Sequence, residues 1–331
     1  MMTSFSTDYV AAKHLDNGVA FLRKNEFRRA IIEFDSALNL SPSDPYAHWN
    51  KATALLSIGD YANGFTEHDW GWRLFDWRGF GPVGDDIDRL KNQLPMWHGE
   101  DISDQRLLVY HELGFGDAIM ALRYLSELKC RAEYITLIIS SPLVKLAKQF
   151  DIEVIEKLPD NLGEYDFRLP LFGVMSALNQ TLDNIPREPY IFANWKQRDW
   201  NKVGISWSGR TQTMFSLESF LSMLNRDRFE LYSLQLTTFS PHHGVVPLKA
   251  QDFIDTIKMI EQLDHIVTVD TAVAHLAGAM GHPSTHLLLP FMMDWRWWHS
   301  EVWYPTIKIY HQDKEDDWLT PFARLNEALK G

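Results

Sequence analysis

Two short stretches of the chain place residues that could do chemistry at the ends of apolar runs. The first, residues 111–117 (HELGFGD), follows the apolar run Leu107–Tyr110 and ends in Asp117, where an amphipathic pattern begins. Gly114 and Gly116 have no side chains that would block a ligand from approaching the backbone closely. Asp117 at a helix start could cap the helix or could remove a proton from a bound group. The spacing alone leaves both interpretations open.

The second stretch begins at the apolar run Ile266–Asp270, after which we expect a helix from Thr271. Helical spacing places Thr271 and His275 on one face near the start of that helix, with Ala272 between them. Backbone N–H groups, the helix dipole, a hydroxyl and an imidazole would then converge on one point, which suits a diphosphate. Gly278 is small enough to let the helix lie close to a sheet. The alternative for His275 is a hydrogen-bonded core residue.

From residue 106 onward, short apolar runs alternate with amphipathic patterns, which is typical of an α/β sheet. The runs are rich in Ile, Val, Leu and Tyr and predict buried parallel strands at Leu107–Tyr110, Tyr134–Ser140, Glu153–Ile155, Lys202–Trp207, Glu230–Leu236, Ile266–Asp270 and Thr285–Leu289. The patterns between or after them predict helices at Asp117–Lys129, Pro142–Phe150, Leu217–Leu224, Phe253–Gln262, Thr271–Met280 and Asp317–Leu329. Both chemical stretches follow strands, at the carboxyl ends where open α/β sheets bind ligands.

The first 78 residues contain an internal repeat with an offset of 34 residues, in which Gly18 aligns with Ala52. Small residues alternate with bulky ones, as two interlocking antiparallel helices require: Gly18, Ala30 and Ala37 against Phe21, Phe27 and Phe34. Pro42 and Pro45 end the second helix. This pattern resembles the tetratricopeptide repeat, with one copy at about 11–44 and a degenerate copy at about 45–78. A plain pair of helical hairpins is the alternative.

Composition and charge exclude several classes of protein. Hydrophobic residues make up 45% and charged residues 23%, as in globular proteins, and the formal net charge of -12 disfavours nucleic-acid binding. No apolar run approaches the roughly 18 residues of a transmembrane helix, and the N-terminus lacks the features of a signal peptide. The single cysteine, Cys130, fits a reducing compartment, so we expect a cytoplasmic protein.

No metal or other cofactor is predicted. Asp86-Ile-Asp88 has the D-x-D spacing that holds a metal in some glycosyltransferases. Here it lies in a glycine-rich stretch before a helix-like pattern rather than at a strand end. A solvated loop is therefore the favoured interpretation.

Four motifs behind the repeats resemble, in type and order, those of bacterial repeat-containing glycosyltransferase-like proteins. They are Glu112-x-Gly-x-Gly-Asp117, Trp207-Ser-Gly209, the stretch 269–278 and Asp294-Trp-Arg-Trp297. Such proteins are similar to glycosyltransferase family 9, the ADP-heptose:lipopolysaccharide heptosyltransferases, and more distantly to the repeat-bearing O-linked N-acetylglucosamine transferases. The resemblance covers about residues 10–320.

The resemblance implies a GT-B fold, in which two Rossmann-like domains face each other across a cleft. With it we expect tetratricopeptide-like helices at 1–78, a connector at 79–105, an acceptor domain at 106–197 and a nucleotide-sugar donor domain at 198–331. It also implies an inverting, metal-independent transfer of a sugar from a nucleotide sugar to a glycan, a lipid-linked sugar or a protein. The repeats would favour a protein or peptide partner.

The resemblance also implies roles for individual residues. Asp117 matches the candidate general base. The residues that match donor contacts are Gly114 and Gly116 on the phosphate side, Ser208 and Gly209 after the first strand of the donor domain, and Asp270, Thr271, Ala272 and His275 at the diphosphate and sugar. An inverting transfer needs such a base, together with positive potential for the departing diphosphate.

This chain departs from the family pattern at two positions. Arg210 is the only basic candidate just after the Ser208-Gly209 loop, where heptosyltransferases commonly hold phosphate. Gln235 falls where the family has an acidic ribose contact. Trp295 and Trp297 could stack on a base or sugar, or could fill a seam between domains. The alternative to an enzyme is a repeat scaffold with a degenerate, non-catalytic GT-B half, and a DNA-modifying transferase ranks last because of the net acidity.

Overall fold

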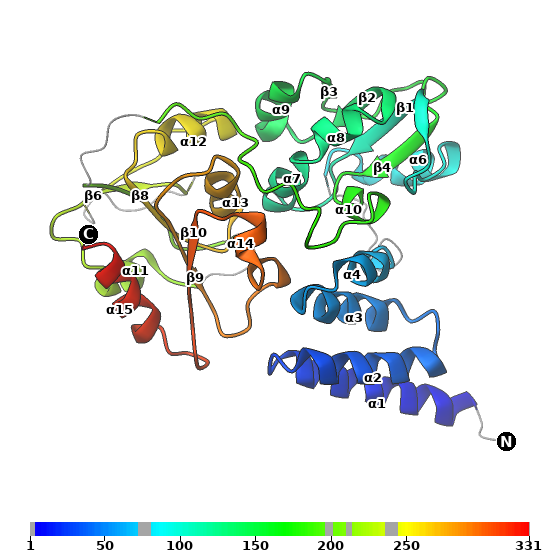
Figure 1. Ribbon diagram of the computed structural model, residues 1–331, viewed down its shortest axis with the longest axis horizontal. Helices are drawn as coiled ribbons and strands as arrows, with labels where there is room; N and C mark the ends of the chain where they lie inside the picture. The colour runs from blue at the N-terminus through cyan, green and yellow to red at the C-terminus, as the bar shows by residue number, and fades with distance from the viewer. Residues whose placement is uncertain (1–3, 72–80, 196–200, 210–213, 236–243, 331) are drawn as a thin grey trace.

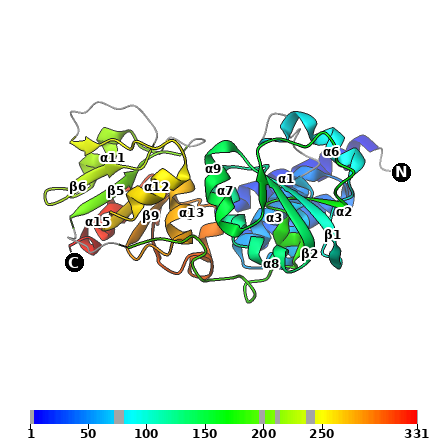
Figure 2. The ribbon, with the colours of Figure 1, turned by 90° about the horizontal axis from the view of Figure 1, so that it is seen from above.

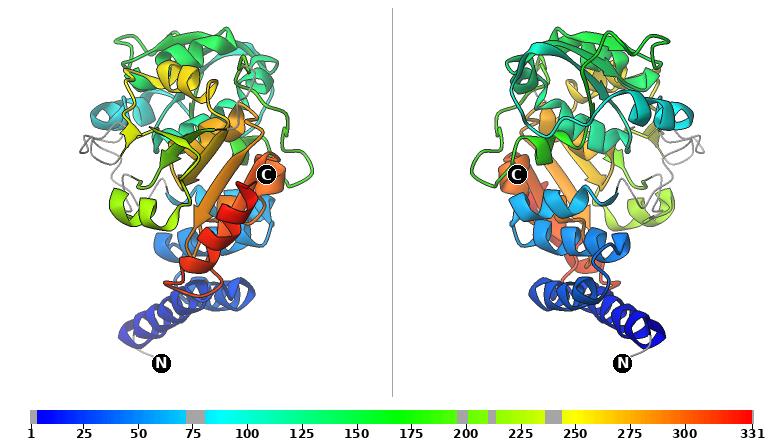
Figure 3. Two further views of the ribbon diagram at one scale, coloured as in Figure 1. Left: turned by 90° about the vertical axis from the view of Figure 1, so that its left-hand side faces the viewer. Right: turned by 90° about the vertical axis from the view of Figure 1, so that its right-hand side faces the viewer.

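The structure is a computed structural model and describes residues 4–71, 81–195, 201–209, 214–235 and 244–330. It has three parts (Figure 1): a helical segment formed by α1–α4, a four-stranded unit formed by β1–β4 with their helices, and a six-stranded unit formed by β5–β10 with their helices. The two sheets lie side by side when the molecule is seen from above (Figure 2). The helical segment projects away from them, with its first two helices farthest out (Figure 3).

The helical segment consists of four helices: α1 (Ser4–Leu22), α2 (Phe27–Leu40), α3 (Pro45–Ser57) and α4 (Tyr61–His68). Each packs on the next in the chain. Asp44 caps α3 by accepting hydrogen bonds from two N–H groups of its first turn, and Pro45 takes the first helical position. A Cβ atom added to Gly18 would lie 2.4 Å from Cε1 of the buried Phe34 ring. The predicted interlocking of a small with a bulky residue is thus confirmed.

The four-stranded unit is a parallel sheet in the order β3-β2-β1-β4. Its strands are β1 (Ile102–Tyr110), β2 (Ala132–Ile138), β3 (Glu153–Ile155) and β4 (Phe167–Pro170). Its helices are η1 (Gly84–Asp86), α6 (Ile87–Gln93), α7 (Phe115–Leu122), α8 (Leu125–Lys129), α9 (Ser141–Ala147), η2 (Lys148–Phe150) and α10 (Val174–Ala177).

The six-stranded unit is a second parallel sheet, in the order β10-β9-β8-β5-β6-β7. Its strands are β5 (Lys202–Ser206), β6 (Glu230–Ser233), β7 (Val245–Val246), β8 (His265–Val269), β9 (Thr285–Leu289) and β10 (Ile307–His311). Its helices are α11 (Leu217–Met223), α12 (Phe253–Ile260), α13 (Ala272–Ala279), η4 (Trp295–Trp297), α14 (Ser300–Trp303) and α15 (Leu319–Ala328). The prediction of an α/β protein with parallel sheets is confirmed.

The structure corrects several predicted boundaries. The described part of the expected connector 79–105 contains η1, α6 and the start of β1. The strand β1 begins at Ile102, five residues before the buried run at its end that the sequence pattern detects. β4, β7 and β10 were not predicted from the sequence. The predicted helix Asp117–Lys129 is two helices, which meet at the buried Arg123. The Asp86-Ile-Asp88 stretch lies at the start of α6 with both carboxylates exposed rather than in a loop.

The three parts share one apolar core. It contains Leu56 and Phe65 of the helical segment, Val109 of β1 and Leu276 of α13, so no boundary between the parts is lined by solvent throughout. Arg123, 5% exposed, holds the seam between the sheets by donating to the carbonyl oxygens of Met120, Pro186 and Trp303, each at 3.1 Å. None of the helices in the described ranges combines the length and apolar character that crossing a bilayer would take.

Candidate active site

The two stretches singled out from the sequence meet in the structure. Helix α7 follows β1 in one unit and α13 follows β8 in the other, and the two helices pack together between the sheets (Figure 2). The contact depends on Gly116, because a Cβ atom there would lie 2.7 Å from Cδ2 of His275 and 3.6 Å from Cα of Ala272. In this structure the space left by the missing Gly116 side chain is occupied by His275.

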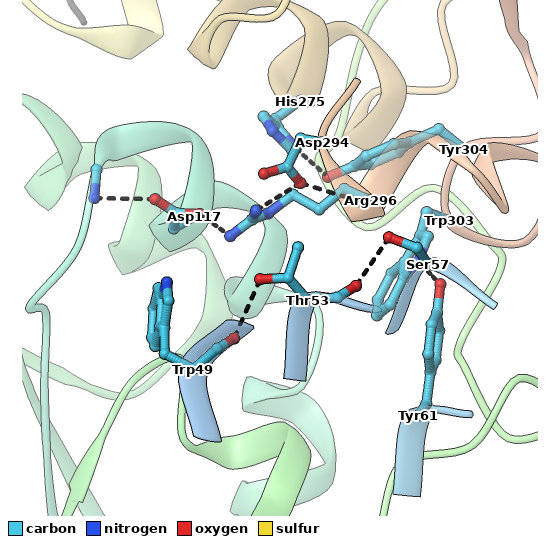
Figure 4. A network of polar contacts seen from close by, with 11 residues as sticks. Trp49, Thr53, Ser57, Tyr61, Asp117, His275, Asp294, Arg296, Trp303 and Tyr304 are labelled. Atoms are coloured by element: carbon cyan, nitrogen blue, oxygen red, sulfur yellow. Dashed lines mark hydrogen bonds and ion pairs between the residues drawn. The ribbon is translucent and has the colours of Figure 1, made fainter. Parts of the chain in front are cut away.

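Asp117 both caps α7 and reaches across the seam (Figure 4). It is the third residue of the helix, and its Oδ2 accepts a hydrogen bond of 3.0 Å from the N–H of Gly114, the N-cap residue. Its Oδ1 accepts a hydrogen bond from Nη2 of Arg296, which belongs to the six-stranded unit. One carboxylate oxygen of Asp117 therefore caps α7, as the structural interpretation predicts, and the other forms an ion pair across the seam.

Arg296 is the centre of the site. Its Nη1 donates to Oδ1 of Asp294 at 2.7 Å, and its guanidinium carbon lies 4.6 Å from the ring centroid of Trp295 and 5.1 Å from that of Phe172. The side chain is only 13% exposed. Burial lowers the pKa of Arg296, but the carboxylates of Asp294 and Asp117 outweigh burial and raise it above the ordinary value. The guanidinium is therefore a permanent positive charge.

Helix α13 begins at Ala272, one residue later than the sequence predicts. Thr271 is the N-cap, and its Oγ1 accepts a hydrogen bond of 3.2 Å from the N–H of Val273. Asp270 precedes it, and burial followed by the negative charge of Asp294 raises the pKa of Asp270 above its ordinary value. A carboxyl group and a helix N-terminus thus lie beside the Arg296 guanidinium.

His275 is buried and neutral. Its Nδ1 lies 3.0 Å from the hydroxyl oxygen of Tyr304, and its ring centroid lies 5.0 Å from that of Trp297. Burial, and then the charges of Arg296 and Arg123, hold the pKa of His275 well below its usual range. An imidazole in this environment can donate or accept a hydrogen bond, but it adds no positive charge to the site.

Trp295 and Trp297 fill the seam. Trp295 is 4% exposed, and its ring centroid lies 5.7 Å from that of Phe65 in the helical segment. Trp297 is 1% exposed and packs against both His275 and Tyr304. Of the two predicted alternatives, stacking on a ligand and filling a seam, the second describes how these rings lie.

The predicted donor contacts beyond β5 form a separate cluster. Gln235 Oε1 accepts hydrogen bonds from the N–H groups of Trp207 and Ser208, at 2.6 and 3.0 Å, and its Nε2 donates to the Ser208 carbonyl at 2.8 Å. The hydroxyl of Ser208 donates to the carbonyl oxygen of Gly209 at 3.3 Å. Gln235 therefore fixes the loop after β5, while Arg210 lies outside the described residues.

Sequence reasoning missed three residues of the site. Arg296 stands within the quoted motif at 294–297, and the signal available was a basic residue among tryptophans. Glu112 accepts from the N–H groups of Leu171 and Phe172, at 2.9 and 2.8 Å, and burial raises the pKa of Glu112 to about 8. His68 of α4 is buried against Phe172, and burial followed by the charge of Arg296 lowers the pKa of His68 to about 3. No sequence pattern points to His68.

The described residues contain no group of three His, Cys, Asp or Glu side chains arranged to hold a metal ion. Glu112 ties the loop after β4 to the end of β1, close to Asp117. The Arg296 guanidinium at the seam is therefore surrounded by acidic and aromatic side chains: Asp117, Asp294, Trp295 and Phe172.

Comparison with known proteins places the chain among remote relatives. No family model matches it. It is similar to Protein FlbA of Caulobacter vibrioides, with 21% identity over 380 residues, covering 98% of this chain and 62% of that protein. The chain thus spans less than two thirds of the length of this curated relative.

Heptosyltransferases are among the solved structures to which the chain is similar. The E. coli ADP-heptose lipopolysaccharide heptosyltransferase II has 12% identity and a TM-score of 0.44, covering 68% of this chain and 98% of that one. The dodecameric iron-containing heptosyltransferase TibC, solved with ADP-D-β-D-heptose, has 14% identity and a TM-score of 0.41, covering 57% of this chain and 59% of that one.

Proposed function

We propose that the protein is an inverting glycosyltransferase that moves a sugar from a nucleotide sugar to a glycan, a lipid-linked sugar or a protein, without a metal ion. The observation that carries the proposal is the meeting of Asp117 with the start of α13 at one seam, around the Arg296 guanidinium. A carboxylate, a permanent cation and a helix N-terminus are the groups that such a transfer uses. The motif resemblance described above points to the same reaction.

In this proposal Asp117 accepts the proton of the acceptor hydroxyl while the oxygen of that hydroxyl forms a bond to the anomeric carbon. The bond from that carbon to the diphosphate oxygen breaks on the opposite face, which inverts the configuration. Arg296 and the N–H groups at the start of α13 stabilise the negative charge of the departing diphosphate. The neutral His275 fixes the position of α13 against Gly116 and Tyr304.

The proposed architecture is a GT-B fold with the four-stranded unit on the acceptor side and the six-stranded unit on the donor side. The helical segment would be a pair of tetratricopeptide-like repeats. Its contact with Trp295 and Trp303 supports a role beside the acceptor, for which a protein or peptide is one candidate. The protein would act in the cytoplasm.

A panel of nucleotide sugars tests the proposal. UDP-, GDP-, ADP- and dTDP-linked sugars are added one at a time, and the melting temperature is measured. At about 100 times its dissociation constant, the correct donor adds about 2.7 kcal/mol to the stability of the folded state. At least one donor is expected to raise the melting temperature. No shift with any of them would contradict the proposal.

A second candidate, a scaffold with a non-catalytic sugar-nucleotide fold, is favoured by one observation. Gln235 stands where the family resemblance implies an acidic ribose contact. Its side-chain amide instead forms hydrogen bonds with the backbone of residues 207 and 208. A donor that binds without any nucleotide release in the presence of candidate acceptors, and equally well to Asp117→Asn, would support the scaffold.

A further inference from the structure

Arg296 joins two carboxylates that belong to different units. Asp294 is two residues away in its own loop and accepts hydrogen bonds both from the backbone N–H of Arg296, at 3.0 Å, and from Nη1. Asp117 lies 179 positions earlier in the chain, on α7 of the other unit, and accepts from Nη2 (Figure 4). The two contacts therefore differ in kind, since one is local to a loop and the other crosses the seam.

The negative charges already around Arg296 disfavour the binding of an additional anion. Asp117, Asp270 and Asp294 all act on the guanidinium, so the cluster is acidic before any ligand arrives. A nucleoside diphosphate brings at least two more negative charges. Because like charges at close range in a buried site repel each other strongly, binding of a diphosphate favours the loss of one carboxylate's hydrogen bond to Arg296.

The structure also shows which donors Arg296 can offer. Nη1 and Nη2 are occupied by Asp294 and Asp117, and Nε is buried without a hydrogen-bond partner among the described residues. A buried N–H without a hydrogen-bond partner is destabilising. A ligand oxygen placed beside Nε and Nη2 would satisfy both donors in the forked geometry that guanidinium and phosphate groups prefer.

We propose that Arg296 is a positioning residue that exchanges partners: it holds Asp117 when the donor site is empty and transfers to the donor diphosphate when the donor binds, which frees Asp117 to act as the base. This inference rests on the proposed function and adds to it a competition between the base and the donor for one guanidinium. Asp117 is the carboxylate that leaves, because Asp294 holds Arg296 at two points with one oxygen, the backbone N–H and Nη1, whereas Asp117 contacts Arg296 only through Nη2 and from the other unit. After the exchange Asp117 remains oriented by the N–H of Gly114.

The exchange makes an unusual prediction, because removing the base should strengthen donor binding. In Asp117→Asn the competing charge is gone, while the amide oxygen can still accept from Gly114. The affinity for a nucleoside diphosphate is measured by titration calorimetry at constant salt, with ADP, GDP, UDP and dTDP as probes. Asp117→Asn should bind the best of them about tenfold more tightly than the wild type, as expected for the loss of one charge-assisted competitor.

A double-mutant cycle separates exchange from a structural role. Arg296→Gln should weaken the same probe by about tenfold or more, and Arg296→Lys should restore part of the affinity because it keeps the charge but not the fork. In the Arg296→Gln background, Asp117→Asn should tighten binding clearly less, because it then removes only the repulsion between Asp117 and the probe and not the competition for the guanidinium. The matched control is the exposed pair Asp313 and Arg324: Asp313→Asn and Arg324→Gln should leave the affinity unchanged.

The affinities of the wild type and Asp117→Asn decide whether Arg296 exchanges partners. If the wild type binds a probe and Asp117→Asn binds it no more tightly, or tightens it equally in both backgrounds, the exchange is refuted while the proposed function stands. If the wild type binds none of the probes but Asp117→Asn does, the exchange is supported. If neither binds any probe, both proposals fail. Because Asp117→Asn keeps Arg296 and the cap of α7, this comparison remains decisive even if Arg296→Gln does not fold.

Discussion

Replacing Gly116 with alanine tests whether this glycine serves the contact between two helices or the approach of a ligand. The added Cβ atom would lie 2.7 Å from Cδ2 and 3.3 Å from Nε2 of His275. Carbon atoms in good contact are about 3.5–4.0 Å apart, so a gap of about 1 Å has to open. The imidazole cannot move aside, because Tyr304 and Trp297 hold it from the other side. Helices α7 and α13 must therefore separate.

The cost follows from this geometry. Overpacking of a rigid core costs about 1–3 kcal/mol, and an alanine in the first turn of a helix returns at most about 1 kcal/mol. We expect Gly116→Ala to destabilise the folded state by about 1–2 kcal/mol, measured as a lower melting temperature. Gly114→Ala is the matched control. Its Cβ atom would meet only Oδ2 of Asp117, at 3.1 Å, and its backbone angles suit any residue.

Two results would contradict a clash between residue 116 and His275. Since the clash is with His275, the double variant Gly116→Ala, His275→Ala should cost about 1 kcal/mol less than the sum of the single variants. Strict additivity would show that the clash is elsewhere. If Gly116→Ala is as stable as the wild type but loses affinity for a nucleoside diphosphate, the glycine makes room for a ligand, as first inferred from the sequence.

Three further predictions concern the seam and the core. Burial, followed by a neighbouring histidine, lowers the pKa of His286 to about 3 from 6.5, so the neutral form is the stable one: its contribution to stability should be full above about pH 6.5 and be lost as the pH drops toward 3, and in urea unfolding His286→Asn should make the fall shallower but not abolish it, because His68 and His275 still contribute. Arg123→Lys should lower stability by about 2–3 kcal/mol, because an ammonium group cannot reach all three carbonyls, whereas Arg131→Lys at an exposed ion pair should change stability by less than about 0.5 kcal/mol in the same thermal melt. Tyr61→Phe leaves the buried Nε1 of Trp303 without its acceptor at 2.8 Å and should cost about 1–3 kcal/mol; an unchanged melting temperature would mean that this hydrogen bond does not hold the helical segment in place.

Local patterns predicted the elements that carry most of the site. The turn before Asp117 and the start of α13 each combine a buried apolar strand with a helix-capping residue, and both are properties of neighbouring residues. Strands β4 and β10 were missed because a local pattern does not show partners that lie far away in the sequence. β4 contains the buried Arg168, which is satisfied by the carbonyl of Leu94 and the hydroxyl of Tyr110, far away in the sequence.

The partners of the chemical residues could not be predicted in this way. The hydrogen bond between Arg296 and Asp117 joins residues 179 positions apart, and its formation depends on how the two sheets pack. The role of Gly116 could not be predicted either, because its small size is equally consistent with space for a ligand and with space for His275. The resemblance implies an acidic ribose contact at the position of Gln235. Only the structure shows that the amide of Gln235 is hydrogen-bonded to the backbone after β5.

The helical segment bears on how the exchange at Arg296 can occur. Asn25 donates to the carbonyl oxygen of Phe291 at 2.9 Å, and Trp303 donates to Tyr61 at 2.8 Å, so the segment is tied to the six-stranded unit. Ser176 of the four-stranded unit donates to Asp69 at 2.6 Å, which ties the segment to the other side of the seam. A rotation of one unit against the other would have to break these contacts together with the shared core. The proposed exchange needs no such rotation, so we expect donor binding to cause only a local movement of the Arg296 side chain. The helical segment would then keep the two units in a fixed relative position.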